Sequence, residues 1–317
     1  MSGERAIRTA GFAVVMLIGL VLPVTAQAAN HWAVVDANGV LVRANGDTHI
    51  GHPGTGVYVV RFAADVHGCG YIANPGDPGT GFVSTASTAS VSRRAGNRDA
   101  VLVQMWDQET GTLSDLPFHL VVYCGATSRF AVVGRGGVIA RAKHALSARR
   151  VSAGRYSVHF DSDVSNCDFT ATIGATRSVP VPSPRAIAVA SGTRTHNVVV
   201  TTIGPSGSPA STPFHLAVSC GTMPLRAVVK ADGTLARAPG TTTSQRLVIG
   251  QYAVVFPRSV RTCAFIATVG DPGSALSTEP LTITTARRSG NPDAAFISVM
   301  QPDGTNFDHA FHIVARC

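Results

Sequence analysis

Charged residues are scarce in this sequence, and so are the residues typical of helical proteins. Only 14% of the 317 residues are charged, and Lys143 and Lys230 are the only lysines. Gly, Ala, Val, Ser and Thr take the place of the Glu, Lys and Leu that helical proteins use. Hydrophobic residues still make up 45% of the chain, so disorder is not expected. The composition favours short strands joined by many turns.

Clustered positive charge is also missing, although the formal charge is +8. Arginines are spread along the chain, singly or as pairs at 93–94, 149–150 and 287–288. Nucleic-acid and polybasic membrane segments need about five or more neighbouring cations. We therefore expect no nucleic-acid partner. The charge fits a solvated basic surface, or weak attraction to anionic surface polymers.

The sequence contains none of the common catalytic or cofactor motifs. G-x-S-x-G, H-E-x-x-H, the Walker loop, zinc-type C-x-x-C and G-x-G-x-x-G in a βαβ setting are all missing. We therefore predict no catalytic residues, no cofactor and a protein that is not an enzyme. The alternative is a hydrolase with a site in one part of the chain, near His49, His52 and His67.

The first 28 residues predict export. Arg5 and Arg8 precede an uncharged, mostly apolar stretch, and Ala26-Gln27-Ala28 is a small-x-small cleavage site. These are the three parts of a secretory signal peptide. The apolar core is shorter than the roughly 20 residues of a spanning helix, so an uncleaved membrane anchor is the less favoured alternative. No later segment is apolar enough to span a bilayer. The mature chain is predicted to be secreted or at the cell surface, without stable membrane insertion.

One pattern of residues recurs three times in the mature chain. Each copy opens with Ala-Val-Val and closes with Phe-His and a cysteine. Between them lies a G-x-Y-x-V-x-F segment, followed at intervals of seven residues by a cysteine and a glycine. Its tyrosine lies 25 positions after the opening alanine, at Tyr58, Tyr156 and Tyr252. The spacing predicts three units over residues 29–125, 126–221 and 222–317, which we call units 1, 2 and 3.

Unit 2 differs most from the other two. Units 1 and 3 contain G-D-P-G at Gly76–Gly79 and Gly270–Gly273, where unit 2 has Gly174-Ala175-Thr176-Arg177. Any activity that needs those loops would be missing from unit 2. The junctions between units are very short, so we expect the units to touch rather than swing freely.

Each unit is predicted to be a β-sandwich, similar to a jelly roll, with seven to nine strands. Apolar residues alternate along the chain, as at Tyr58, Val60 and Phe62, which places them on one face of a strand. Asn38-Gly39 and Asp232-Gly233 separate short apolar runs, a strong hairpin signal. No segment has clear helical periodicity. The predicted fold class is therefore all-β, with three tandem β-sandwich domains.

All six cysteines lie in the exported part, and an even count in an oxidising compartment indicates disulfides. Alternation places both cysteines of a unit on inward faces of strands. Pairing within each unit is favoured because it keeps the unit self-contained. Each such bridge closes a loop of about 55 residues, worth on the order of 4 kcal/mol in the chain-entropy model. The predicted bridges are Cys69–Cys124, Cys167–Cys220 and Cys263–Cys317.

A histidine recurs directly after the phenylalanine of each closing strand, at His119, His215 and His312. It should point away from the core of its own unit, toward the surface or a neighbouring unit, with local hydrogen bonds. The alternative is that the three imidazoles converge and bind a metal or an anion, since three histidines suit zinc. Each G-D-P-G loop has one carboxylate, too few for calcium. No metal is predicted.

Together these motifs resemble the globular heads at the C-terminal ends of bacterial collagen-like and tail-fibre-like secreted proteins. The matching features are Trp32 with Ala-Val-Val, the Asn-Gly or Asp-Gly hairpin, G-x-Y-x-V-x-F, C-x-[YF]-x-A, G-D-P-G, R-x-G-N and the Phe-His closure. Heads of that kind are similar to trimeric jelly rolls of the tumour-necrosis-factor type. Phe130 and Arg226 replace Trp32 in the later units. The resemblance implies a pseudo-trimer of three joined units within one chain.

The preferred function is a secreted or cell-surface, non-catalytic binding or adhesion protein. Tandem domains raise avidity for repeated ligands, so a surface glycan or an envelope polymer is the inferred partner. A structural protein of the cell envelope is the second hypothesis, and the hydrolase is the third. The sequence predicts neither the ligand nor the oligomeric state. A bacterial source is favoured because no N-x-S/T acceptor occurs.

Overall fold

The computed structural model of the protein describes residue 3 and residues 30–182, 185–221 and 225–317. Within these ranges every regular element is a β-strand, so the predicted all-β class is confirmed. The predicted signal peptide lies outside the described residues, apart from residue 3. The described part of the chain contains no helix long and apolar enough to cross a membrane.

Unit 1 forms eight strands in two four-stranded layers, ordered β2-β1-β8-β5 and β3-β4-β7-β6. We call the first layer of each unit its inner sheet and the second its outer sheet. The strand count lies within the predicted seven to nine. The strands are β1 (His31–Val35), β2 (Leu41–Ala44), β3 (Thr48–Gly54), β4 (Val57–Phe62), β5 (Gly70–Pro75), β6 (Ser87–Arg94), β7 (Asn97–Asp107) and β8 (Phe118–Tyr123).

The same strand order occurs in units 2 and 3. Their inner sheets are ordered β10-β9-β16-β13 and β18-β17-β24-β21, and their outer sheets β11-β12-β15-β14 and β19-β20-β23-β22. In unit 2 the strands are β9 (Arg129–Val133), β10 (Ile139–Lys143), β11 (Ala145–Ser152), β12 (Arg155–Phe160), β13 (Asp168–Gly174), β14 (Ala186–Ser191), β15 (Asn197–Ile203) and β16 (Phe214–Ser219). In unit 3 they are β17 (Leu225–Val229), β18 (Leu235–Arg237), β19 (Thr243–Val248), β20 (Gln251–Val255), β21 (Ala264–Asp271), β22 (Thr282–Arg287), β23 (Ala294–Met300) and β24 (Phe311–Arg316).

Each unit has its own apolar core between its inner and outer sheets. In β4 the alternating side chains of Tyr58, Val60 and Phe62 are at most 3% exposed, as the sequence pattern predicts. They pack against the closing strand β8, where Phe118 and Leu120 are fully buried. Removal of these two apolar faces from water stabilises each unit, and it explains the sandwich-like arrangement of its sheets.

Tight turns begin the central outer strand of each unit. The glycine that opens the G-x-Y segment has a φ of 65° to 66° at Gly56, Gly154 and Gly250. This left-handed conformation strains any residue that has a Cβ atom. The backbone therefore requires glycine there, which explains why the residue recurs in all three units.

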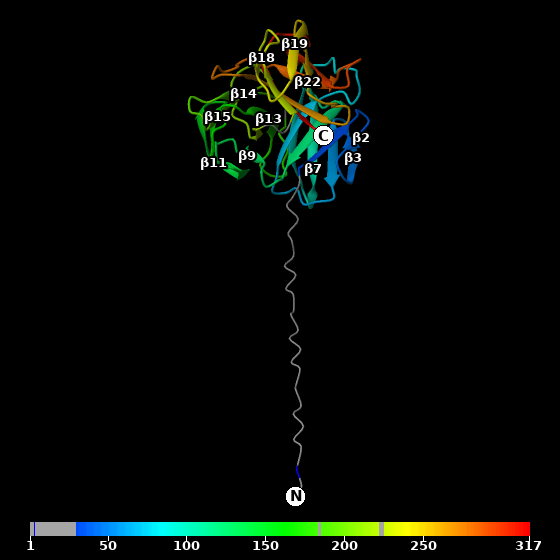
Figure 1. The fold of residues 1–317 in the computed structure, drawn as a ribbon, viewed down its shortest axis with the longest axis vertical. Coiled ribbons are helices and arrows are strands. Elements are labelled where there is room, and N and C mark those ends of the chain that lie inside the picture. Colours follow the sequence, from blue (N-terminus) through cyan, green and yellow to red (C-terminus); the bar gives the residue numbers. More distant parts are fainter. Residues whose placement is uncertain (1–2, 4–29, 183–184, 222–224) are drawn as a thin grey trace.

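The inner sheets of units 2 and 3 continue into the outer sheets of units 1 and 2, and an isolated bridge links the inner-sheet side of unit 1 to the outer sheet of unit 3. Strand β13 of unit 2 pairs in parallel with β6 of unit 1, and β21 of unit 3 pairs in parallel with β14 of unit 2. A parallel bridge between Gly76 and Thr285 joins unit 1 to unit 3 in the same way. In Figure 1 the blue-to-cyan, green and yellow-to-red segments lie to the right, to the left and at the top of one rounded body.

A glycine lies at each of these junctions, seven residues after the first cysteine of the unit. These glycines are Gly76, Gly174 and Gly270. A Cβ atom on Gly76 would lie 2.7 Å from Oγ1 of Thr285, and one on Gly174 would lie 2.6 Å from Cγ2 of Val91. One on Gly270 would meet the carbonyl group of Val189. Real Cβ contacts are longer than this, so glycine recurs because two units approach each other at this point.

A fourth buried cluster lies between the units. It combines Trp32 of β1 and Phe130 of β9 with Ile266 of β21, so all three units contribute to it. Each of these side chains is at most 6% exposed. Apolar packing therefore joins the three units in addition to the sheet pairing.

The three predicted disulfides are confirmed. Cys69–Cys124, Cys167–Cys220 and Cys263–Cys317 are bonded, with sequence separations of 55, 53 and 54 residues. One detail of the prediction was wrong, because the cysteines flank the strands instead of lying within them. Cys69 precedes β5 by one residue and Cys124 follows β8 by one residue, since β5 and β8 pair side by side and end together.

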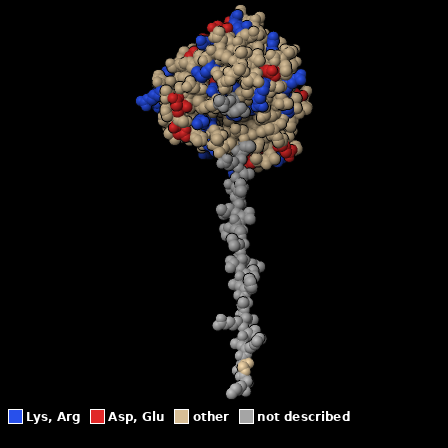
Figure 2. Space-filling model, in the orientation of Figure 1, with Lys and Arg blue, Asp and Glu red and all other residues tan. Residues whose placement is uncertain are grey.

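Charged side chains are dispersed over the surface. On the face shown in Figure 2, basic and acidic groups lie scattered among uncharged residues. This view agrees with the scattered arginines of the sequence and with its low charged content of 14%.

Candidate functional site

The recurring histidines lie between units and are fully buried. His119, His215 and His312 follow the inward phenylalanines of β8, β16 and β24, so their side chains leave the core of their own unit. Each Nδ1 accepts a hydrogen bond from a backbone N–H of another unit. The donors are Phe265 at 2.7 Å for His119, Tyr71 at 3.0 Å for His215 and Phe169 at 3.0 Å for His312. Of the two positions predicted from the sequence, the surface and a neighbouring unit, the histidines occupy the second.

The second ring nitrogen of each histidine faces a carbonyl oxygen of its own unit. Nε2 lies 3.3 Å from the oxygen of Asp77 for His119, 3.1 Å from that of Ala175 for His215 and 3.4 Å from that of Asp271 for His312. A neutral imidazole with its hydrogen on Nε2 satisfies both contacts, because Nδ1 is then free to accept. A second proton on Nδ1 would oppose the N–H donor of the neighbouring unit.

Burial keeps these imidazoles neutral. Desolvation, with a smaller contribution from nearby Arg43, lowers the pKa of His119 from 6.5 to about 3. Desolvation and Arg237 lower the pKa of His312 to about 3, and desolvation and Arg141 hold the pKa of His215 well below 6.5. All three imidazoles are therefore uncharged in the folded protein at neutral pH.

The histidines do not share one site. His119 contacts unit 3, His215 contacts unit 1 and His312 contacts unit 2, so the three rings occupy three different interfaces. Each Nδ1 lone pair already accepts a hydrogen bond and is not free to bind a metal. Over the described residues, no three His, Cys, Asp or Glu side chains gather as a metal site requires. The converging arrangement considered from the sequence is therefore not the observed one.

An arginine recurs at the same interfaces and was missed by our sequence reasoning. It lies ten residues after the alanine of each Ala-Val-Val opening, as Arg43, Arg141 and Arg237. Its Nε donates to the carbonyl oxygen of the first cysteine of another unit, at 3.0 Å to Cys263, 2.7 Å to Cys69 and 2.9 Å to Cys167 respectively. Its Nη1 donates within its own unit to Pro78, Thr176 and Pro272. The fixed offset was the sequence signal that could have revealed it.

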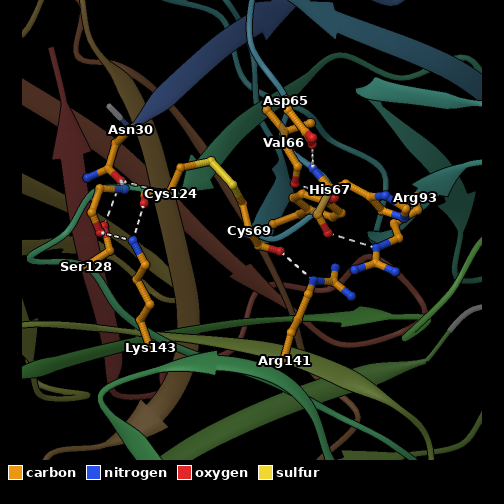
Figure 3. The surroundings of a disulfide bond; sticks show 12 residues. Asn30, Asp65, Val66, His67, Cys69, Arg93, Cys124, Ser128, Arg141 and Lys143 are labelled. Atoms are coloured by element: carbon orange, nitrogen blue, oxygen red, sulfur yellow. Dashed lines mark hydrogen bonds between the residues drawn. A yellow bond between two sulfur atoms is a disulfide. The ribbon is translucent and has the colours of Figure 1, made fainter. Parts of the chain in front are cut away.

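Figure 3 shows this contact around the first disulfide. Arg141 of unit 2 reaches the carbonyl oxygen of Cys69, and Lys143 reaches that of Cys124 at 2.7 Å. The guanidinium of Arg141 also lies 5.0 Å from the ring centroid of Tyr71. Cationic donors therefore satisfy both cysteine carbonyls, which lie beyond the ends of their strands and have no ladder partner there.

A third set of polar contacts links the strands that follow the first cysteines. Thr172 donates its hydroxyl to the oxygen of Ala73 and accepts from the N–H of the same residue, at 2.8 and 2.9 Å. Thr268 binds Ala171 in the same way, and the Oδ1 of Asn74 accepts from the N–H of Ala267 at 3.3 Å. Each contact crosses from one unit to another, and together they connect all three.

The replacement of Trp32 by Phe130 and Arg226 has a structural explanation. Each of these residues faces the first position of β5, β13 or β21 in another unit. Phe130 covers Gly70, where a Cβ atom would come within 2.8 Å of the ring, and Trp32 shares its buried cluster with Ala264. Arg226 faces Asp168, with Nη1 3.2 Å from Oδ2. At two of the three interfaces a large aromatic side chain thus packs against a glycine or an alanine. At the third, an arginine pairs with an aspartate.

The Asp168 carboxylate is fully buried, and its charge is only partly compensated. Desolvation raises its pKa from 3.8 to about 7, against the opposing influence of Arg226 and Arg237. Among the described residues, neither of its oxygens accepts a well-aligned hydrogen bond, although the ion pair with Arg226 is close. This geometry explains why desolvation exceeds the attraction between the charges.

The histidines of the hydrolase alternative have separate partners. His49 Nε2 lies 3.2 Å from Asp47, and both side chains are about three-quarters exposed. His52 Nε2 lies 2.9 Å from Asp115, and its ring stacks on Tyr58 with centroids 4.5 Å apart. His67 adjoins the first disulfide, where its carbonyl oxygen accepts from Arg93 (Figure 3). The described contacts do not join the three into one site.

The aspartates of the G-D-P-G loops shape their own turns. Oδ1 of Asp77 accepts from the N–H groups of Gly79 and Gly81, at 2.7 and 3.1 Å. Oδ1 of Asp271 accepts from Gly273 at 2.7 Å. These are the local hydrogen bonds expected of aspartate in turns, and they account for the motif without a ligand.

The recurring histidines and arginines thus share one role, which is to hold one unit against another. Comparison of the chain with protein-family models, with curated proteins and with solved structures gave no match in any of the three cases.

Proposed function

We propose that the protein is an exported, non-catalytic binding protein whose three β-sandwich units pack as a pseudo-trimer within one chain. The observation that supports this most strongly is the cyclic order of the inter-unit contacts. Unit 2 binds unit 1 through His215, unit 3 binds unit 2 through His312, and unit 1 binds unit 3 through His119. The resemblance to trimeric heads of bacterial secreted proteins agrees with this order.

Export is supported by the three disulfides and by the sequence of the first 28 residues. Disulfides persist in oxidising compartments and are rare in the reducing cytoplasm. All six cysteines of the chain are bonded, and none is free. We infer that the mature protein functions outside the cytoplasm or at the cell surface.

Small-angle scattering tests the pseudo-trimer. A compact body of the mature length has an expected radius of gyration of about 19 Å. We expect the purified mature protein to give this value, with a single-peaked distance distribution. Three units in a row would give a larger radius and an elongated profile, and that result would exclude the compact packing. Measurement over a concentration series separates a compact monomer from an oligomer.

Binding is proposed because the residues that recur serve the interfaces, whereas the outer sheets differ from unit to unit. On the face of the second outer strand that points away from the core, unit 1 has the partly exposed Val57 and Val59, unit 2 has the partly exposed Arg155 and Ser157, and unit 3 has the partly exposed Gln251 beside a buried Ala253. A purely structural envelope protein needs no such variation. A glycan array probed with the mature protein is expected to give saturable signals for surface polysaccharides. A blank array would favour the structural alternative.

A further inference from the structure

Positive charge is concentrated in unit 2. Residues 126–221 contain ten basic and three acidic residues, a net charge of +7. Residues 29–125 contain five basic and eight acidic residues, and residues 222–317 contain nine and six. Since all three units have the same strand order, the fold does not require this difference.

A broad groove lies on the exposed side of the outer sheet of unit 2. It runs over β11, β12 and the start of β15, with about 1380 Å³ of empty space that includes its open side. Arg149, Arg155, Arg194 and His159 line it, together with neutral polar and small residues. None of the described residues that line the groove carries a carboxylate.

The three groove arginines have no acidic partner in the described structure. Arg149, Arg155 and Arg194 take part in none of the ion pairs between described residues. The Nε atom of Arg155 is buried and donates to no described acceptor. Guanidinium groups without an acidic partner favour an anionic ligand, because they can form charge-assisted hydrogen bonds with it.

The groove is built on a rigid base. Nδ1 of His159 lies 2.8 Å from Oδ1 of Asn197, and Nδ2 of Asn197 donates to Oγ of Ser157 at 3.3 Å. These residues come from the neighbouring strands β12 and β15, whose backbones pair at His159 and Asn197. Strand-mounted side chains tied to one another hold a binding surface better than loop residues do.

The arginines occur in unit 2 only. Strand register places Arg149, opposite Ser157, at the position of Gln245 in unit 3 and Gly51 in unit 1. In the same way Arg155 corresponds to Gln251 and Val57. The carbonyl oxygen of Arg194 accepts from the backbone N–H three residues later, as that of Asn291 does in unit 3. The same framework therefore forms with neutral residues at all three positions.

We propose that this groove binds an anionic polysaccharide. Arginine forks form paired, charge-assisted hydrogen bonds with carboxylate, sulfate and phosphate groups. The amide of Asn197 and the hydroxyls of Ser147 and Ser157 suit the hydroxyl groups of sugars. The described lining residues include no Phe, Tyr or Trp, so they offer no aromatic platform for nucleic-acid bases. The inference rests on the proposed binding function and names its ligand class and site.

Two pairs of polymers test the proposal with the purified mature protein. Polygalacturonate is compared with its neutral methyl ester, and dextran sulfate with dextran, by calorimetry at low and physiological salt. We expect each anionic polymer to bind about tenfold or more tightly than its neutral partner, and more weakly as salt rises. Equal affinity within both pairs would overturn the proposal. Tighter binding of single-stranded DNA than of either anionic polysaccharide would also overturn it.

The groove variant combines Arg149→Gln, Arg155→Gln and Arg194→Asn, which are the residues of unit 3 at these positions. The control variant, Arg94→Gln, Arg177→Gln and Arg258→Gln, removes the same charge from exposed sites outside the groove. We expect the groove variant to lose about tenfold or more in affinity for the anionic polymers, and the control to lose less than about threefold. Equal losses would contradict the site. Array binding that survives in the groove variant would leave the proposed function intact and refute this inference alone.

Discussion

Lowering the pH from 7 to 4.5 is expected to destabilise the protein steeply. The pKa values of His119 and His312 are about 3 when folded and that of His215 is well below 6.5, whereas the unfolded groups titrate near 6.5. Between these limits the unfolded chain binds more protons, so folding stability falls as the pH falls. Each buried histidine contributes a slope of about 1.4 kcal/mol per pH unit.

Asp168 opposes this trend in part of the same range. Its folded pKa of about 7 exceeds its unfolded value of 3.8, so between these limits the folded chain binds the extra proton and gains stability as the pH falls. One carboxyl group against three histidines leaves a net loss on the order of 3 kcal/mol per pH unit. The acid effect should therefore dominate below pH 6.5.

Denaturant unfolding at pH 7, 5.5 and 4.5 measures this slope. His215→Gln is expected to remove about half of this net slope, because glutamine does not titrate. His49→Gln is the matched control, since its side chain is 75% exposed and should leave the slope unchanged. A free energy of unfolding that stays level from pH 7 to 4.5 would contradict the assignment, as would an unaltered slope in His215→Gln.

The sequence predicted the all-β class and the disulfides well because the signals for them are local and periodic. Alternation at Tyr58, Val60 and Phe62 identified a strand whose apolar face is buried, and the offset between Cys69 and Cys124 identified a bridge that is formed. Both depend on residues of one unit. The class of fold and the disulfides could therefore be derived without knowledge of how the units meet.

The contacts between units could not be derived in the same way. Arg43 donates to Cys263, 220 residues away in the chain, and nothing in the local pattern around Arg43 indicates that partner. His119 was predicted to leave its own core, but its acceptor role toward Phe265 depends on how unit 1 sits beside unit 3. The recurrence of both residues showed that they matter, while the relative placement of the units decided what they do.

Removing the Asp168 carboxylate is expected to cost about 3–5 kcal/mol, because Asp168→Ala leaves the guanidinium of Arg226 buried without its partner. Both side chains are at most 8% exposed, so water cannot replace the lost carboxylate. Combining Asp168→Gly with Arg226→Phe copies the Gly70–Phe130 contact between units 1 and 2 and should recover most of the loss. Denaturant unfolding of both variants measures the difference, and a double variant no more stable than Asp168→Ala would contradict the equivalence of these contacts.

The two single changes should also differ in their pH dependence. Arg226→Phe leaves a carboxyl group whose pKa is already raised to about 7, so Asp168 can take up a proton and become neutral. The cost of Arg226→Phe relative to the native protein should therefore shrink between pH 7.5 and 5.5. Asp168→Ala removes this titrating group and with it the stability that the native protein gains when Asp168 is protonated, so the cost of Asp168→Ala should grow by about 2 kcal/mol over the same range. If the costs of the two variants changed with pH in the same way, the pKa of the Asp168 carboxylate would not lie near 7 in the folded protein.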